Sequence, residues 1–147
     1  MIEKKDDSAI KVIFICYGNA CRSAMAEMIC NAYGKGEVVS ESAGVHPALP
    51  YIEVDQPTII AMREIGIDIS CHKPKHIRSL DLSFFDVLIN MSPLPSKDLL
   101  KHSRTFKGII IEWAVIDPRG RSPMIYRKVR DDLKKKVLDL IKTLTAR

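Results

Sequence analysis

The sequence predicts an α/β fold: a single doubly wound domain with a central parallel sheet of about four strands and helices on both faces. Apolar stretches rich in β-branched residues alternate along the chain with stretches of helical periodicity. That alternation is typical of a parallel sheet that helices cover. The length of 147 residues suits one domain. We therefore assign residues 10–147 to this domain and residues 1–9 to a flexible N-terminal segment.

The strands are predicted from short apolar runs. Residues 10–16 form a continuous apolar run, as expected of a central strand that is buried on both faces. A short second strand begins at residues 38–40, a third spans residues 85–90, and a fourth spans residues 108–111. In a parallel sheet, ligands bind outside the carboxyl ends of the strands.

Helices are predicted at residues 23–33, 57–65 and 123–144. Gly34 and Gly66 follow the first two, and Pro123 fits the first turn of the third. The third helix carries one apolar stripe, made by Ile125, Val129, Leu133, Val137, Leu140, Ile141 and Leu144.

Composition limits the class of protein. Apolar residues make up 46% of the chain and charged residues 28%, a balance that is ordinary for a soluble protein. No apolar run is long enough for a membrane span, and no secretory signal opens the chain. We therefore expect a cytoplasmic protein without a membrane partner, either a monomer or a weak dimer.

The net charge of +5 favours an anionic partner, which leaves nucleic acid and a phosphorylated substrate as candidates. The densest basic run, residues 134–136, falls within a helical pattern and is interpreted as a solvated face. We expect a phosphorylated substrate and no nucleic-acid partner.

The four cysteines are Cys16, Cys21, Cys30 and Cys71. Their spacing contains no CxxC pair, and cytosolic thiols stay reduced, so neither a zinc site nor a disulfide framework is predicted. We expect no metal and no cofactor, and we interpret Cys30 and Cys71 as structural.

The segment with the clearest chemistry is the loop from Cys16 to Arg22. These two residues form a C-x5-R pair at the point where a buried strand ends and a helix begins. Gly18 and Asn19, between them, tolerate unusual backbone angles. Such a loop directs backbone N–H groups and a helix N-terminus toward one point, and the Arg22 guanidinium matches two phosphate oxygens. The segment is therefore predicted to hold a tetrahedral dianion.

Cys16 would lie at the floor of that loop, where the groups that bind phosphate also stabilise a thiolate. A thiolate there could attack phosphorus and form a phosphocysteine intermediate. The alternative is an inert core cysteine at a strand end. We favour the nucleophile, since the whole loop supports it.

A phosphate ester also needs a general acid for its leaving group. Asp117, followed by Pro118, lies in a polar loop between the fourth strand and the last helix, at the same edge of the sheet. From the residues alone, an ordinary turn aspartate is an equal interpretation.

Together these segments resemble the low-molecular-weight protein tyrosine phosphatases, a superfamily that includes thioredoxin-coupled arsenate reductases. The resemblance extends from Val12 to about Leu144 and is most specific over residues 12–27. Further matches are residues 42–44, residues 66–68 with His72 shortly after, residues 85–86, and Asp117 with Pro118.

The resemblance implies a role for each matched position. Cys16 would be the nucleophile, Arg22 the clamp on the oxyanion, and Asp117 the general acid and later the base. The phosphate-binding loop would comprise Tyr17, Gly18, Asn19, Ala20, Cys21 and Arg22.

The resemblance also implies that three positions outside the loop, Ser23, Ser42 and His72, support it. Asn19 would hold the loop by hydrogen bonds, with Ser42 and His72 behind it. Ser23 would donate its hydroxyl to the thiolate, although Ser23 as a helix cap and His72 as a turn histidine are compatible alternatives. Cys21 resembles the family's redox partner of Cys16; its alternative is an inert small apolar residue.

The sequence departs from the tyrosine phosphatases after the Asp-Pro pair, where the family usually carries aromatic residues. Here Arg119 and Gly120 follow. Tyr17, His46 and Tyr51 could supply pocket walls instead, and Arg119 could contact an aromatic ring or a phosphopeptide.

The chain also departs from the thioredoxin-coupled arsenate reductases, which place two resolving cysteines at and beyond the end of the third strand. This sequence has residues 90–96 there without a cysteine, and no cysteine follows Cys71. A reductase that uses an external thiol would not need them.

The sequence therefore leads to three hypotheses. The first is a tyrosine phosphatase that hydrolyses phosphotyrosine in proteins, or a small aryl phosphate, through phosphocysteine. The second is an arsenate reductase that uses an external thiol. The third is a binding module without catalysis, against which Cys16, Arg22 and Asp117 together argue.

Overall fold

The computed structural model describes residues 8–49, 52–102 and 105–146. Its centre is a parallel sheet of four strands in the order β2-β1-β3-β4. The predicted α/β fold with a parallel sheet of about four strands is therefore confirmed. The strands are β1 (Ile10–Cys16), β2 (Val38–Gly44), β3 (Val87–Asn90) and β4 (Ile109–Glu112).

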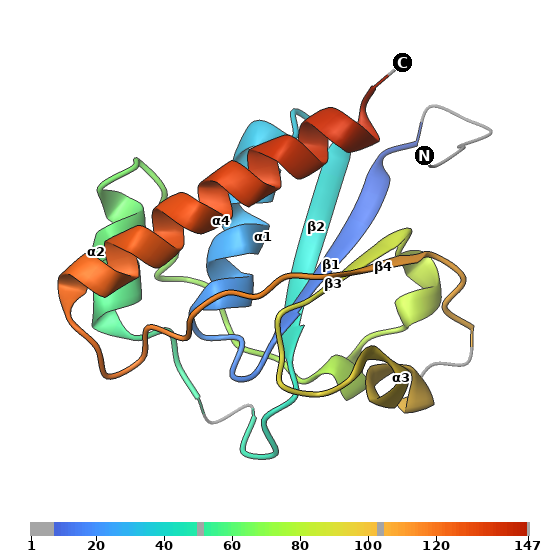
Figure 1. Cartoon of the computed structure of the whole chain (residues 1–147), viewed down its shortest axis with the longest axis horizontal. Coiled ribbons are helices and arrows are strands. Elements are labelled where there is room, and N and C mark those ends of the chain that lie inside the picture. The colour runs from blue at the N-terminus through green and yellow to red at the C-terminus, as the bar shows by residue number, and fades with distance from the viewer. Residues whose placement is uncertain (1–7, 50–51, 103–104, 147) are drawn as a thin grey trace.

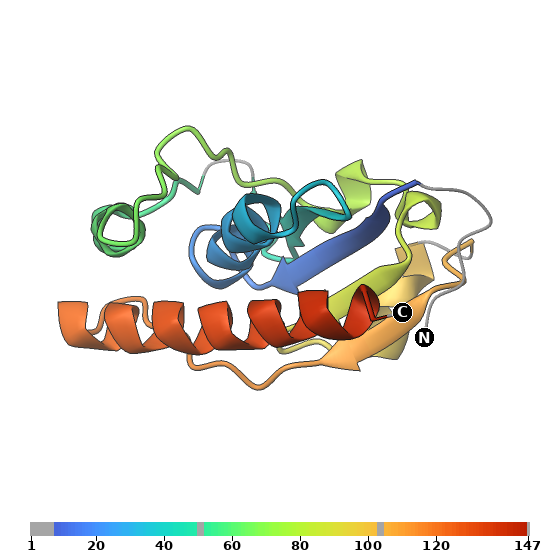
Figure 2. The ribbon, with the colours of Figure 1, turned by 90° about the horizontal axis from the view of Figure 1, so that it is seen from above.

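Helices cover both faces of the sheet (Figures 1 and 2). The α-helices are α1 (Arg22–Tyr33), α2 (Gln56–Arg63), α3 (Ser96–Leu99) and α4 (Pro123–Leu144). Three short 3-10 turns, η1 (Ile77–Ser79), η2 (Leu82–Phe84) and η3 (Leu100–His102), complete the set within the described residues.

The β1 strand explains how the two faces differ. Val12 and Phe14 point into the core that α1, α2 and α4 share, whereas Ile13 and Ile15 point into a smaller core under η1, η2 and α3. All four side chains are fully buried. A strand that is buried on both faces consists of a continuous apolar run, which is why the pattern of residues 10–16 predicts a central strand.

The long helix α4 packs along α1, and its N-terminal end lies beside α2 (Figure 1). Most of the predicted apolar stripe is buried, with Ile125 and Ile141 half-buried at its margin. Arg130 is also buried in this stripe, where its Nη1 donates to the Ala61 carbonyl at 2.8 Å and to Glu64 at 2.7 Å. The two arginines Arg127 and Arg130 lower the pKa of the Glu64 carboxyl to about 2.

Several element boundaries differ from the predicted ones by a few residues. The largest difference is in β2, which runs to Gly44 because all seven of its residues pair with β1 from Ile10 to Cys16. Pairing to the end of β1 brings Ser42 and Gly44 to the carboxyl edge of the sheet, next to the loop that follows Cys16.

The strand order places that loop at the switch point of the sheet. From β1 the chain passes through α1 to β2 on one side, and it then crosses back to β3 on the other side. Ligands of doubly wound folds bind at the carboxyl edge where the order reverses. None of the helices in the described ranges is long and apolar enough to cross a membrane.

Candidate active site

The thiol of Cys16 lies at the end of β1, at the base of the loop that leads into α1. Its Sγ is 2.9 Å from the Ser23 hydroxyl, and the backbone N–H of Asn19 donates to it over 3.3 Å. Only 2% of Cys16 is exposed. The sulfur therefore lies within hydrogen-bond reach of one hydroxyl and one backbone N–H group at the base of the loop, where the sequence predicts the nucleophile.

Asn19 takes a backbone conformation that few side chains tolerate. Its φ is 54°, in the left-handed region where asparagine is enriched. This turn folds residues 17–21 back over Cys16 before α1 begins at Arg22. The choice of asparagine, predicted to shape the loop, therefore has a backbone reason.

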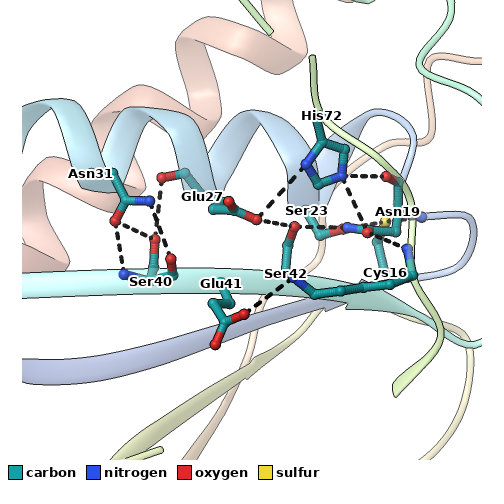
Figure 3. Close-up of polar contacts among 10 residues, drawn as sticks. Cys16, Asn19, Ser23, Glu27, Asn31, Ser40, Glu41, Ser42 and His72 are labelled. Carbon is teal, nitrogen blue, oxygen red and sulfur yellow. Dashed lines mark hydrogen bonds and ion pairs between the residues drawn. The ribbon is translucent and has the colours of Figure 1, made fainter. Parts of the chain in front are cut away.

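The Asn19 side chain is fully buried and every polar atom of its amide has a partner (Figure 3). Its Nδ2 donates to the hydroxyls of Ser23 and Ser42, both at 2.8 Å. Its Oδ1 accepts from the backbone N–H of Lys75 at 3.0 Å. The structure thus brings together Asn19, Ser23 and Ser42, as the sequence predicted, and adds Lys75.

His72 and Glu27 lie behind the loop (Figure 3). The Nε2 of His72 is 3.1 Å from the Asn19 carbonyl, and its Nδ1 is 4.0 Å from the Glu27 carboxylate. Glu27 also accepts from the Ser42 hydroxyl at 2.5 Å. Burial lowers the pKa of His72 below its ordinary value, more strongly than Glu27 and the Asn19 carbonyl raise it.

Gly44 lets β2 approach the loop closely. A Cβ at this position would lie 2.7 Å from the Tyr17 carbonyl oxygen and 3.0 Å from the Asn19 nitrogen. The same Tyr17 carbonyl accepts from the backbone N–H groups of Val45 and His46, at 2.9 and 2.8 Å. The match at residues 42–44 therefore has a packing reason.

Arg22 connects the loop to the ends of two further strands. Its Nη1 donates to the carbonyls of Met91 and Val115, at 3.1 and 3.3 Å. Met91 follows β3 and Val115 follows β4, so the buried guanidinium holds three segments in one arrangement. A guanidinium fixed in this way can present its remaining N–H groups to an oxyanion.

Asp117 lies at the same edge, as predicted. One of its carboxylate oxygens is 3.6 Å from the Arg22 guanidinium, and the other accepts from the Arg119 backbone N–H at 3.2 Å. The Asp117 side chain is 46% exposed, so it can exchange protons with solvent. This placement is compatible with a general acid beside the loop, and that role stays a prediction.

A cleft of about 670 Å³ opens beside Arg22 and Asp117. Its walls include the apolar side chains of Met91, Pro93, Trp113 and Ile116, with Tyr17 at the rim. Tyr17, a predicted wall residue, is 40% exposed and its ring meets the edge of His46 at 4.7 Å. Tyr51, also predicted as a wall, lies outside the described residues.

Cys21, the predicted redox partner of Cys16, is 3% exposed. Burial raises the pKa of its thiol, although a hydrogen bond with Thr58 opposes that effect. Cys30 is also buried, which raises the pKa of its thiol to about 11, whereas Cys71 is exposed. The role of Cys21 as redox partner of Cys16 stays a prediction.

A second polar group lies behind Cys21 and was not predicted. The Asp55 carboxylate accepts from the hydroxyls of Thr58 and Tyr126, the latter at 2.5 Å. Tyr126 belongs to α4, and Asp55 and Thr58 belong to the start of α2. No short motif joins these residues, because they are brought together only by the packing of the two helices.

Glu27, Lys75 and Trp113 were missed for different reasons. Glu27 stands one helical turn after Ser23, a spacing that could have indicated it. Lys75 acts through its backbone, which leaves no signal in the side chain. Trp113 directly follows β4 and could have been noted as an aromatic residue at the carboxyl edge.

No three His, Cys, Asp or Glu side chains lie close enough to hold a metal ion within residues 8–49, 52–102 and 105–146. The site thus combines the loop after β1, the end of β2, the segment after α2 that carries His72 and Lys75, and the segments after β3 and β4. Together they present a shielded thiol, a fixed guanidinium and an exposed carboxylate.

Residues 11–147 match the family described as low molecular weight phosphotyrosine protein phosphatase. The chain belongs to this family. The predicted family is therefore confirmed, and the chain is an enzyme of the low-molecular-weight phosphatase family, which sets aside the binding module without catalysis.

The relatives of this chain include arsenate reductases and phosphatases. The chain is 33% identical over 132 residues to glutaredoxin arsenate reductase from Synechocystis sp., covering 89% of this chain and 95% of that protein. It is 32% identical over 142 residues to arsenate reductase 1 of Staphylococcus haemolyticus, covering 90% and 96%. A solved low molecular weight protein tyrosine phosphatase from T. tengcongensis superposes with a TM-score of 0.81 at 30% identity, covering 92% and 99%.

These comparisons favour arsenate reduction, the alternative of the sequence analysis, over hydrolysis of phosphotyrosine. The specific activity is therefore a proposal in either case.

Proposed function

We propose that this chain reduces arsenate, with Cys16 as the nucleophile and an external thiol as the reductant. The observation that carries the proposal is the full-length similarity to arsenate reductases, one of which is described as a glutaredoxin arsenate reductase. Arsenate has the tetrahedral shape and charge of phosphate, which the loop from Cys16 to Arg22 suits.

The first step would form a covalent arsenate adduct. The Cys16 thiolate attacks arsenic, the S–As bond forms and one As–O bond breaks. Asp117 donates the proton with which that oxygen leaves as water. Arg22 and the loop N–H groups hold the remaining oxygens.

In the second step an external thiolate attacks Cys16 Sγ. The S–As bond then breaks, its electron pair reduces arsenic from As(V) to As(III), and arsenite leaves. The resulting mixed disulfide is cleaved by a second thiol, which returns Cys16 as thiolate and gives the disulfide of the external thiol.

The need for an external thiol follows from the chain's own cysteines. No cysteine follows Cys71, and the segment after β3 carries Asn90 and Ser92 instead. The Asn90 amide has its hydrogen-bond partners within this segment, because it accepts from Ser92 and donates to Leu94 and Ser96. Cys21 is buried with a raised thiol pKa, which disfavours it as an internal resolving thiol.

Hydrolysis of phosphate monoesters through phospho-Cys16 is the second candidate, and the cleft beside Arg22 favours it. Its walls are partly apolar, with Trp113 and Met91 among them. A free oxyanion needs no such walls, whereas an aryl leaving group would pack against them. Phosphotyrosine in a protein or a small aryl phosphate is the expected substrate class.

One assay with two arms tests both candidates, with EDTA present in each. The first arm follows arsenite release from arsenate with glutathione, and the second follows phosphate release from matched phosphotyrosine and phosphoserine peptides. Cys16→Ser serves as the blank. Thiol-dependent arsenite release above the blank is the expected result. Its absence, together with release from the phosphotyrosine peptide alone, would overturn arsenate reduction and establish the phosphatase.

A further inference from the structure

We propose that Arg119 binds a carboxylate carried by the molecule that reacts at Cys16. This inference rests on the proposed function, because it names a recognition element for the partner of that same site. Arg119 stands where the sequence departs from the aromatic residues of the tyrosine phosphatases.

The guanidinium of Arg119 lies against the loop from Cys16 to Arg22. A Cβ placed on Gly18 would be 3.4 Å from Arg119 Nη1 and 3.9 Å from the end of the Ile52 side chain. Because residue 18 is glycine, no side chain fills the space between Arg119 and Ile52. The guanidinium therefore faces the loop two residues beyond the nucleophile.

The turn after Asp117 holds Arg119 in this place. The Asp117 carboxylate accepts from the Arg119 backbone N–H at 3.2 Å, and its second oxygen lies toward Arg22 at 3.6 Å. Asp117 thus connects the two guanidinium-bearing residues. Arg22 is buried, whereas Arg119 is exposed to solvent.

Within the described part of the chain, no carboxylate lies within 4.0 Å of the Arg119 guanidinium, whereas Arg127 and Arg130 are both paired with Glu64. An arginine near a reaction site with no carboxylate partner of its own can pair with one from a ligand. Its planar fork matches the two oxygens of a carboxylate.

The reacting oxyanion would already be held by the loop and Arg22. An anion at Arg119 would therefore be a second group of the same ligand or of the thiol that follows it. A thiol with carboxylates, such as glutathione, and a phosphate ester with a carboxylate share this chemistry. An aromatic residue at the same position would instead favour a flat apolar ring.

Phosphonates test the inference without turnover, since their P–C bond resists hydrolysis. Calorimetry would compare methylphosphonate with phosphonoacetate, 3-phosphonopropionate and 4-phosphonobutyrate on the wild-type chain. We expect at least one phosphonocarboxylate to bind about tenfold more tightly than methylphosphonate, as one charged hydrogen-bonded pair allows. In Arg119→Gln that ratio should fall toward one.

Arg121→Gln is the matched control. It removes the same charge from the same loop, and Arg121 is also exposed. The long-range attraction between the protein and an anionic ligand should therefore change equally in both variants. The ratio should persist in Arg121→Gln. An equal fall in both variants, or an unchanged ratio in Arg119→Gln, would overturn the role of Arg119.

Kinetics distinguish the two sources of the carboxylate. For arsenate reduction, kcat/KM with glutathione is compared with that for 2-mercaptoethanol; for hydrolysis, 4-carboxyphenyl phosphate is compared with phenyl phosphate. If the preference for glutathione falls in Arg119→Gln, the carboxylate belongs to the thiol; if the preference for 4-carboxyphenyl phosphate falls, it belongs to the phosphate ester. Unchanged preferences in both reactions would contradict the inference. Failure of the chain to bind phosphate or methylphosphonate would instead contradict the proposed function, and the inference with it.

Discussion

At the scale of single residues, Asn19 and Arg22 determine how the site is arranged. Asn19 takes the left-handed turn and satisfies its amide with Ser23, Ser42 and Lys75. Arg22 satisfies part of its guanidinium with two backbone carbonyls. Because the protein already holds these side chains in place, the proposed oxyanion site would need little reorganisation during the reaction.

The acid role of Asp117 belongs to this scale. Asp117→Asn keeps the shape but cannot donate a proton in the same way, so the first step should slow by on the order of 10²-fold. The loss should be largest for aryl phosphates with poor leaving groups, or for formation of the arsenate adduct. Steady-state rates across a series of aryl phosphates measure this. An equal loss on good and poor leaving groups would show that Asp117 only positions Arg22.

At the scale of elements, the loop after β1 depends on the strand beside it. β2 continues to Gly44, where the missing side chain admits the Tyr17 carbonyl. The loop is thus supported by β2 on one side and by the segments after β3 and β4 on the other, through Arg22.

Gly44→Ala tests the contact with β2. The added Cβ would lie 2.7 Å from the Tyr17 oxygen, so backbone must move and the loop with it. We expect loss of phosphate binding by tenfold or more, roughly the effect of one displaced hydrogen-bonded group.

Gly66→Ala is the control for Gly44→Ala. Gly66 has a φ of +80° but open space around its Cβ position, so this variant should lower stability by about 1 kcal/mol and leave phosphate binding intact. Equal phosphate affinity in Gly44→Ala and the wild type would contradict the close approach.

The junction of α2 and α4 gives a second prediction at this scale. Tyr126→Phe removes the hydroxyl that donates to Asp55, in a side chain that is only 2% exposed. We expect a loss of unfolding free energy of about 1–3 kcal/mol, because the Asp55 carboxylate keeps Thr58 but loses its second hydroxyl donor. Urea denaturation measures it. Tyr33→Phe, at a residue that is 37% exposed, should change stability far less.

At the scale of the whole molecule, the reversal of strand order collects residues from distant parts of the sequence at one edge. His72 is an example, since it belongs to the segment after α2 and its ring lies behind Asn19. Its surroundings combine the Glu27 carboxylate, the Asn19 carbonyl and the Lys75 ammonium, and burial is the strongest influence on its pKa.

This environment predicts how stability depends on pH. The pKa of His72 is lowered in the folded state from 6.5, so below that value the unfolded chain binds more protons than the folded one. Stability should therefore fall as pH decreases from 6.5 toward the lowered value, by at most about 1.4 kcal/mol per pH unit for one proton. Urea unfolding of the wild type and His72→Gln measures the slope. Equal slopes in the two proteins would exclude His72 as the cause.

The alternation of apolar runs and helical segments was enough to predict the α/β fold, since burial on both faces of β1 leaves a direct pattern in residues 10–16. The loop from Cys16 to Arg22 could also be predicted from the sequence, because its residues are consecutive. Tertiary packing was needed for everything that joins separate segments: the Lys75 N–H on Asn19, the carbonyls on Arg22, the Asp55–Tyr126 pair and the place of Arg119. Backbone donors and contacts between distant elements leave no local spacing in a sequence, so such partners become visible only once the chain has folded.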